Sequence, residues 1–167
     1  MKRSPTRHAT LAVATLEKLD TAFGESYHPA DFGEIVRREI HAFSDASKDT
    51  IGASVFLRLF NEICTALLFG QSNKVAPAQT TSIPRLELCA PVLASRAVAK
   101  IREEIDMEFN AITFYTDSKV VLGYIQNESR RFYVYVANRV QIIRGISSPS
   151  QWRYVDTSKN PADLSTR

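Results

Sequence analysis

The sequence has few cysteines and lacks a long apolar run, and both features restrict the classes of protein it can belong to. Cys64 and Cys89 are too few for a disulfide framework or a structural zinc site, which fits a reducing intracellular setting. No apolar run approaches the ~20 residues that a membrane-spanning helix needs. The basic opening is followed by a short apolar stretch, Ala9 to Leu16, and then at once by Glu17, which argues against a signal peptide. We therefore expect an intracellular protein, in cytoplasm or nucleus, with no membrane partner.

The composition is that of one ordinary globular domain. The chain has 167 residues, of which 44% are hydrophobic and 23% charged. Its 21 basic and 18 acidic residues give a net charge of +3, which permits an anionic partner without requiring one. Residues 1–39 are of mixed polarity with turn signals and are predicted to be a lead-in or connection segment. Residues 40–167 are predicted to form the domain, with a C-terminal helix cut short.

The order of apolar patterns predicts a mixed α/β fold. Residues 39–45, 51–60 and 62–70 are short runs typical of three antiparallel strands. A helix is predicted from Pro84, with one apolar stripe from Leu86 to Ile105, and a buried strand over 111–117. Two helices, a strand over 151–156 and the start of a last helix follow. Because parallel strands need a helical crossover, the order predicts a mixed five-stranded sheet with helices on both faces.

Four carboxylates fall at positions where this order can bring them together. Asp45 ends the first strand, Asp117 ends the fourth, and Glu87 and Asp163 stand in the first turns of two helices. If the first and fourth strands are neighbours, these acids converge, and their mutual repulsion requires hard cations such as Mg²⁺. Two such ions can activate water and stabilise the departing oxygen of a phosphodiester. The pattern therefore predicts a metal site for phosphodiester hydrolysis.

Each acid also has an ordinary structural interpretation. Asp45 suits a turn, Asp117 suits a helix N-cap, and Asp163 follows Asn160 and a proline in a capping arrangement. Glu87 near a helix start interacts favourably with the helix dipole. Only the joint occurrence of the four favours the metal site.

One stretch, Ser129 to Val155, contains no acidic residue and interleaves arginines with aromatics. Such a surface can follow a phosphate backbone, although aromatics at helical spacing are more often core and exposed arginines are often only solvated. The candidate nucleic-acid-binding residues are Lys119, Arg130, Arg131, Asn138 and Arg139.

Five strings carry a family resemblance: HAFSDAS, IPRLELCA, FYTDSKVVLGYI, RFYVYVANRV and SSPSQWRYVDTSKNPADLSTR. In order and spacing they resemble the ribonuclease H region of the Pol polyprotein of BEL/Pao-type long terminal repeat retrotransposons, over residues 27–167. The resemblance implies a ribonuclease H-like fold and an endonuclease that cleaves the RNA strand of RNA–DNA hybrids with two Mg²⁺ ions, or Mn²⁺ in their place. It also implies a reverse transcriptase polymerase domain upstream and an integrase downstream.

By the same resemblance, each acid has a role. Asp45 looks like the bridging ligand of both metals, and Glu87 like the ligand near the RNA 2′-hydroxyl. Asp117 looks like the third ligand, which orients water, and Asp163 like a peripheral fourth. An integrase core is disfavoured, because its glutamate would follow both aspartates.

Two features depart from the family pattern. The loop VDTSKNPAD lacks the histidine that cellular ribonucleases H carry before the last aspartate. Pro91 stands seven residues into the helix that carries Glu87. A proline there predicts a kink, which would change the direction of the Glu87 side chain. The alternative function is therefore a catalytically inactive, ribonuclease H-like nucleic-acid-binding relic or domesticated fragment.

Overall fold

The computed structural model describes residues 36–47, 50–60, 65–72, 83–104, 108–127, 129 and 131–163. The predicted lead-in over residues 1–35 lies outside the described residues. The strands are β1 (Arg37–Ala46), β2 (Ile51–Phe60), β3 (Thr65–Ser72), β4 (Ala111–Thr116) and β5 (Trp152–Tyr154). The helices are α2 (Ile83–Glu104), α3 (Lys119–Gln126) and α4 (Val134–Ile146), with 3₁₀ turns η1 (Pro149–Gln151) and η2 (Thr157–Lys159).

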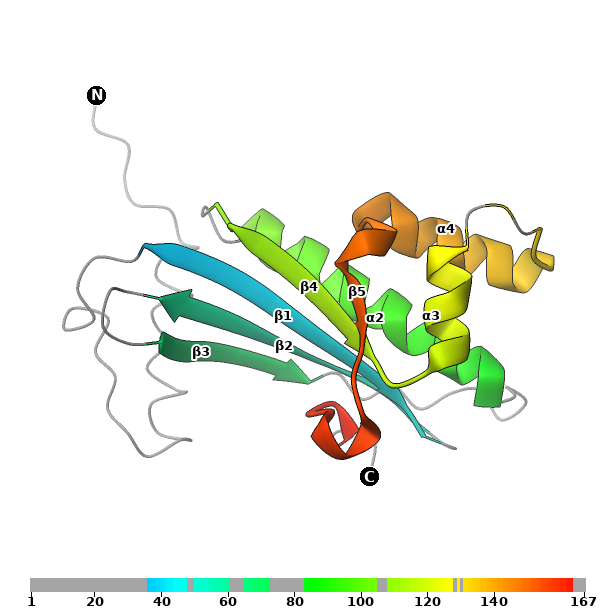
Figure 1. Cartoon of the computed structure of the whole chain (residues 1–167), viewed down its shortest axis with the longest axis horizontal. Coiled ribbons are helices and arrows are strands. Elements are labelled where there is room, and N and C mark those ends of the chain that lie inside the picture. The colour runs from blue at the N-terminus through cyan, green and yellow to red at the C-terminus, as the bar shows by residue number, and fades with distance from the viewer. Residues whose placement is uncertain are drawn as a thin grey trace.

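The five strands form one mixed sheet in the order β3-β2-β1-β4-β5 (Figure 1). The first three strands pair antiparallel, as their short connections predict, and β4 lies parallel to β1 on its other side. The long helix α2 provides the crossover that this parallel pairing requires. The fold is therefore the predicted mixed five-stranded sheet, and β1 occupies its centre.

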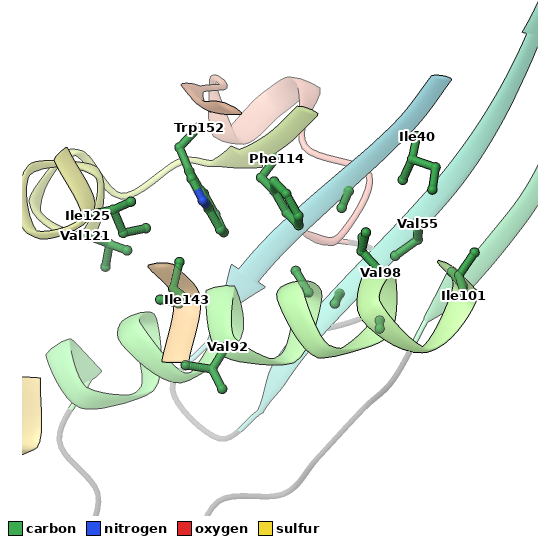
Figure 2. Packing of buried hydrophobic residues seen from close by; sticks show 14 of the residues in the cluster. Ile40, Val55, Val92, Val98, Ile101, Phe114, Val121, Ile125, Ile143 and Trp152 are labelled. Atoms are coloured by element: carbon green, nitrogen blue, oxygen red, sulfur yellow. The ribbon is translucent and has the colours of Figure 1, made fainter. Parts of the chain in front are cut away.

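One hydrophobic core lies between the sheet and α2 (Figure 2). Ile40 and Phe114 point from neighbouring strands toward Val98 of α2, because alternate strand residues share one face. The Phe114 and Trp152 rings stack with centroids 4.8 Å apart. Trp152 is fully buried, and its indole N–H donates to the Ser147 hydroxyl at 2.9 Å. The core therefore fixes the relative positions of the strands that end near the acids.

The described helices all contribute to this one core. Residues of α2, α3 and α4 belong to the same buried cluster, so these helices share one face of the sheet. We predicted helices on both faces of the sheet. Within the described residues, helices cover one face. None of these helices is long and apolar enough to cross a membrane.

The helix α2 differs from its predicted form in three ways. It begins at Ile83, so Glu87 lies in the second turn and not in the first. Pro91 is fully buried within one uninterrupted helix of 22 residues, so the predicted kink does not divide the helix. The single apolar stripe was also incomplete, because α2 packs on β1 and β2 and also on α4, which buries Leu88 and Val98 as well.

Candidate active site

Strand pairing brings Asp45 and Asp117 to the same edge of the sheet. In the parallel ladder of β1 and β4, Ser44 stands opposite Thr116. The next residue after each is an aspartate, so the two acids are brought together by the register of neighbouring strands. Figure 1 shows β1 and β4 side by side. Asp45 is 7% exposed, and Asp117 is about half-buried. The convergence expected for the first and fourth strands is therefore present.

Glu87 reaches the same edge from α2. Its carboxylate accepts a hydrogen bond at 3.0 Å from the Ser118 hydroxyl, and Ser118 directly follows Asp117. The same hydroxyl accepts the Val121 N–H at 3.3 Å and so caps α3. Because one serine both starts α3 and holds Glu87, the helix that follows β4 fixes the direction of the glutamate.

The pKa of Asp117 reflects its burial and the charges of the other two acids. Burial raises the pKa of Asp117 above its ordinary value of 3.8, and the negative charges of Asp45 and Glu87 raise it further. The Thr157 hydroxyl opposes this by donating to Oδ2 of Asp117 at 3.0 Å, which lowers the pKa. Asp45 and Glu87 therefore lie close enough to Asp117 to disfavour its anionic form.

Asn160 attaches the C-terminal segment to this edge. Its side-chain N–H donates to the Ser44 carbonyl at 3.0 Å, and its Oδ1 accepts the Ala162 N–H at 3.2 Å. The Asp163 N–H donates to the Asn160 carbonyl at 3.1 Å. Since Ser44 directly precedes Asp45, the backbone of Asp163 is held beside the end of β1. The predicted last helix lies mostly outside the described part of the chain, which ends at Asp163.

The carboxylates fit a hard divalent cation in chemistry, but they are not arranged as a ligand set. Among the described residues, no group of three or more His, Cys, Asp or Glu side chains is arranged to hold a metal ion. Glu87 and Asp117 instead accept the hydroxyl hydrogen bonds described above. Carboxylate oxygens from three elements at one sheet edge are the ligand type that Mg²⁺ takes. Ligation would require the acids to turn from the hydroxyls toward a shared centre.

The predicted nucleic-acid residues have different surroundings. Arg131 and Asn138 are exposed, whereas Arg130 lies outside the described residues. Lys119 follows Asp117 by two residues, and its ammonium lies 5.0 Å from the centroid of the Tyr154 ring. The Arg139 guanidinium lies 3.4 Å from the centroid of the Tyr135 ring. Their contact with nucleic acid stays a prediction.

Three residues of the site were not assigned to it from the sequence. Ser118 and Thr157 hold two of the acids, and Asn160 joins the last segment to β1. The sequence suggested an N-cap at Asp117, whereas the N-cap of α3 is the next residue, Ser118. Asn160 was visible only as part of a capping arrangement. No local pattern singled out Thr157.

Comparisons with known proteins identify one family. Residues 29–118 match the family model described as the Pao retrotransposon-like RNaseH-like domain. A comparison with curated protein sequences gives no match.

Several solved structures resemble the chain at low sequence identity. RNase H1 from the halophilic archaeon Halobacterium salinarum NRC-1 is 16% identical, with a TM-score of 0.47. The match covers 77% of this chain and 92% of the archaeal chain. LC11-RNase H1 in complex with an RNA/DNA hybrid gives the same identity and coverages with a TM-score of 0.48. Prototype foamy virus protease-reverse transcriptase is 12% identical, covers 85% of this chain and 20% of its own, and has a TM-score of 0.44.

Proposed function

The chain belongs to the Pao retrotransposon RNaseH-like family, and from this premise we propose that it is a divalent-metal-dependent endonuclease that cleaves the RNA strand of RNA–DNA hybrids. The single observation that carries the proposal is the meeting of Asp45, Glu87 and Asp117 at one edge of the sheet. Carboxylates that lie close together disfavour one another's negative charge, and a bound cation offsets this repulsion. The proposed setting is a Pol polyprotein, with a polymerase domain upstream and an integrase downstream.

The proposed roles are those that the family resemblance implies, and the position of each residue is compatible with them. Asp45 is buried at the end of the central strand, which suits it to a fixed, shared position between two cations. Glu87, oriented by Ser118, would lie toward the RNA 2′-hydroxyl, the group that distinguishes RNA from DNA. Asp117, oriented by Thr157, would position the attacking water, and Asp163 would be a peripheral fourth ligand. When bound by these carboxylates, Mg²⁺ or Mn²⁺ would lower the pKa of water and neutralise charge on the leaving oxygen.

A cleavage assay tests the proposal directly. The protein is incubated with Mg²⁺ and an RNA–DNA hybrid labelled on the RNA strand, with duplex DNA and duplex RNA of the same sequence in parallel. We expect cleavage of the hybrid RNA only, and a loss of at least about 100-fold with Asp45→Asn, which removes the charge and keeps the shape. The matched control is Glu104→Gln, because Glu104 is an exposed acid paired with Lys100 on the far end of α2. Equal cleavage by wild type and Asp45→Asn, or none by a folded wild type, refutes the proposal.

The second candidate is an inactive domain that binds hybrids without cleaving them. The observation in its favour is that Glu87 and Asp117 are satisfied by hydroxyl groups and not arranged as a ligand set. Such a domain would bind the hybrid with equal strength in wild type and Asp45→Asn, and Mg²⁺ would not change its melting temperature. A metal-dependent rise in melting temperature that Asp45→Asn abolishes excludes this candidate.

A further inference from the structure

The sheet has a second face, on which none of the described helices packs. Figure 2 shows Ile40, Val55 and Phe114 pointing toward α2. Because successive strand residues point to opposite faces, the residues next to these along each strand lie on the other side of the sheet. The strand registers bring six such residues together, and we call this surface the open face: His41, Phe43, Phe56, Arg58, Tyr115 and Arg153.

Aromatic rings form the centre of the open face. The Phe43 ring stacks on Tyr115 with centroids 4.5 Å apart and meets Phe56 edge-on at 5.7 Å. The His41 ring is stacked on Tyr115 at 5.9 Å, and its Nδ1 lies 3.1 Å from the Tyr115 hydroxyl. All four side chains are only partly buried. Contiguous exposed rings on a sheet indicate a surface that another segment or molecule covers.

Positive charges flank these rings. Arg58 on β2 and Arg153 on β5 are exposed, and neither forms an ion pair within the described part of the chain. Glu39, which stands opposite Arg58 in the strand register, is 7% exposed and already pairs with Arg37 and His41. The rings therefore lie between two exposed guanidinium groups that an acidic occupant could pair with.

One segment of the same chain has the complementary composition. Residues 17–35 hold five acidic residues and one lysine, together with the aromatic residues Phe23, Tyr27 and Phe32. They lead directly into β1, and the Val36 N–H donates to the Phe60 carbonyl at 2.9 Å. The segment therefore joins the sheet at the end of β1 near which Arg58 lies.

The reach of this segment is sufficient. Arg58 and Arg153 are separated by three strand spacings of about 4.8 Å and by four residues along the strands, or roughly 20 Å. An extended chain spans about 3.3 Å per residue, so about six or seven residues of the segment can cross that distance. A tethered segment is also present at an effective concentration on the order of millimolar, which a second copy in dilute solution does not reach.

We propose that residues 17–35 dock on the open face, with their carboxylates at Arg58 and Arg153 and their aromatic side chains on the rings between these arginines. The occupant is thus the chain itself, and the interaction does not depend on the nuclease function proposed above. Exposed ion pairs are individually weak, so contact between the aromatic rings provides most of the docking free energy and the charges select the position.

Photo-crosslinking in the full chain tests the docking. Phe56→p-benzoylphenylalanine places a photoreactive ring at the centre of the open face, and mass spectrometry after irradiation and proteolysis identifies the captured residues. The matched control is Arg96→p-benzoylphenylalanine, because Arg96 is exposed on α2, on the other side of the sheet. Circular dichroism melting verifies that the variants are folded, and Thr113→p-benzoylphenylalanine provides a second position on the same face.

Charge variants test whether the acids of the segment direct the docking. The segment variant combines Asp20→Asn, Glu25→Gln, Asp31→Asn and Glu34→Gln. Its control combines Glu103→Gln and Glu104→Gln, which neutralise two exposed acids at the end of α2. Both variants are compared with wild type at low and high salt, by capture with the probe on the open face and by melting temperature without a probe.

We expect the probe on the open face to capture residues 17–35 within single chains, and the probe at Arg96 to capture none of them. The segment variant should reduce this capture roughly threefold at low salt and lower the melting temperature by about 2–4 °C, because exposed ion pairs are lost. Salt at about 1 M should reduce capture in wild type similarly, and the control variant should change neither quantity.

Four outcomes overturn the proposal. The first is capture between two chains, seen as a covalent dimer, and the second is capture only of other parts of the chain. The third is no capture from either position on the open face. The fourth is a segment variant that matches wild type in both capture and melting temperature.

Discussion

The side chain of Asn160 is expected to be the main attachment of the C-terminal segment, and Asn160→Ala tests this. Asn160 is 4% exposed and links Ser44, near the C-terminal end of β1, to Ala162 in the segment that carries Asp163. Alanine removes the donor to the Ser44 carbonyl and the acceptor of the Ala162 N–H. Both Ser44 and Ala162 are buried, so water cannot easily replace the lost groups.

The expected loss of stability follows from those two contacts. A buried donor left without a partner costs about 1–3 kcal/mol, and the loss of a neutral hydrogen bond at a carbonyl costs about 1 kcal/mol. We therefore expect Asn160→Ala to reduce the free energy of unfolding by about 2–4 kcal/mol, which corresponds to a melting temperature lower by roughly 5–15 °C for a chain of this size. Asn160→Asp should be at least as destabilising at neutral pH, because its carboxylate faces the Ser44 carbonyl oxygen.

Urea unfolding followed by the fluorescence of Trp152, the only tryptophan, measures the effect. The control is Asn138→Ala, because Asn138 is exposed on α4 and its amide should contribute less than about 0.5 kcal/mol. The deficit of Asn160→Asp should shrink as the pH falls and its carboxyl gains a proton that can be donated. If Asn160→Ala is no less stable than Asn138→Ala, the segment is not held by this side chain and the reasoning fails.

Three further predictions concern the acids and the core. In EDTA at pH 7, Asp117→Asn should raise the melting temperature by ~1–2 °C, a small value because the half-exposed group is screened by solvent. The pKa of Asp117 is raised in the folded state, so its contribution to stability is present below pH 3.8 and is lost as the pH rises through the folded-state pKa. The difference in melting temperature between wild type and Asp117→Asn should therefore vanish in acid. A lower melting temperature of Asp117→Asn at pH 7 would contradict this prediction. Mg²⁺ at ten times its dissociation constant should stabilise wild type by about 1.4 kcal/mol and Asp45→Asn much less, as differential scanning fluorimetry can measure. Phe114→Ala should cost about 3–5 kcal/mol in urea unfolding, because it removes a buried ring stacked on Trp152; a loss below about 1 kcal/mol would show that the stack contributes little.

The sheet and its helices were predictable because their signals are local. Short apolar, β-branched runs predicted β1 and β2, and the helical crossover allowed a parallel strand after it, whereas the pairing of β4 with β1 was only a condition that the structure meets. That pairing alone brings Asp45 and Asp117 to one edge. The single stripe assigned to α2 was incomplete, since a helix with the sheet on one side and α4 on the other is buried around most of its surface.

The contacts that orient the acids could not be predicted in this way. The partners of Glu87, Asp117 and Asn160 are 31, 40 and 116 residues away in sequence. Each contact depends on where two separate backbone elements meet, and a serine or threonine hydroxyl leaves no periodic signal. Sequence patterns therefore indicated which acids converge but not which hydroxyl groups hold them.

The hydroxyl contacts are the observation in favour of the inactive alternative, and yet they are compatible with metal binding. Ser118 uses its lone pair to cap α3 and its proton to hold Glu87. If Glu87 turned to a cation, only the proton would lose its partner, and the cap with its backbone geometry would remain. A hydrogen bond to a charged group contributes about 1.5–3 kcal/mol, and a released hydroxyl can bond to water instead. Thr157 is exposed, so the same exchange is open to it when Asp117 turns. Exchange of these hydroxyl partners for a cation would therefore leave the cap of α3 in place.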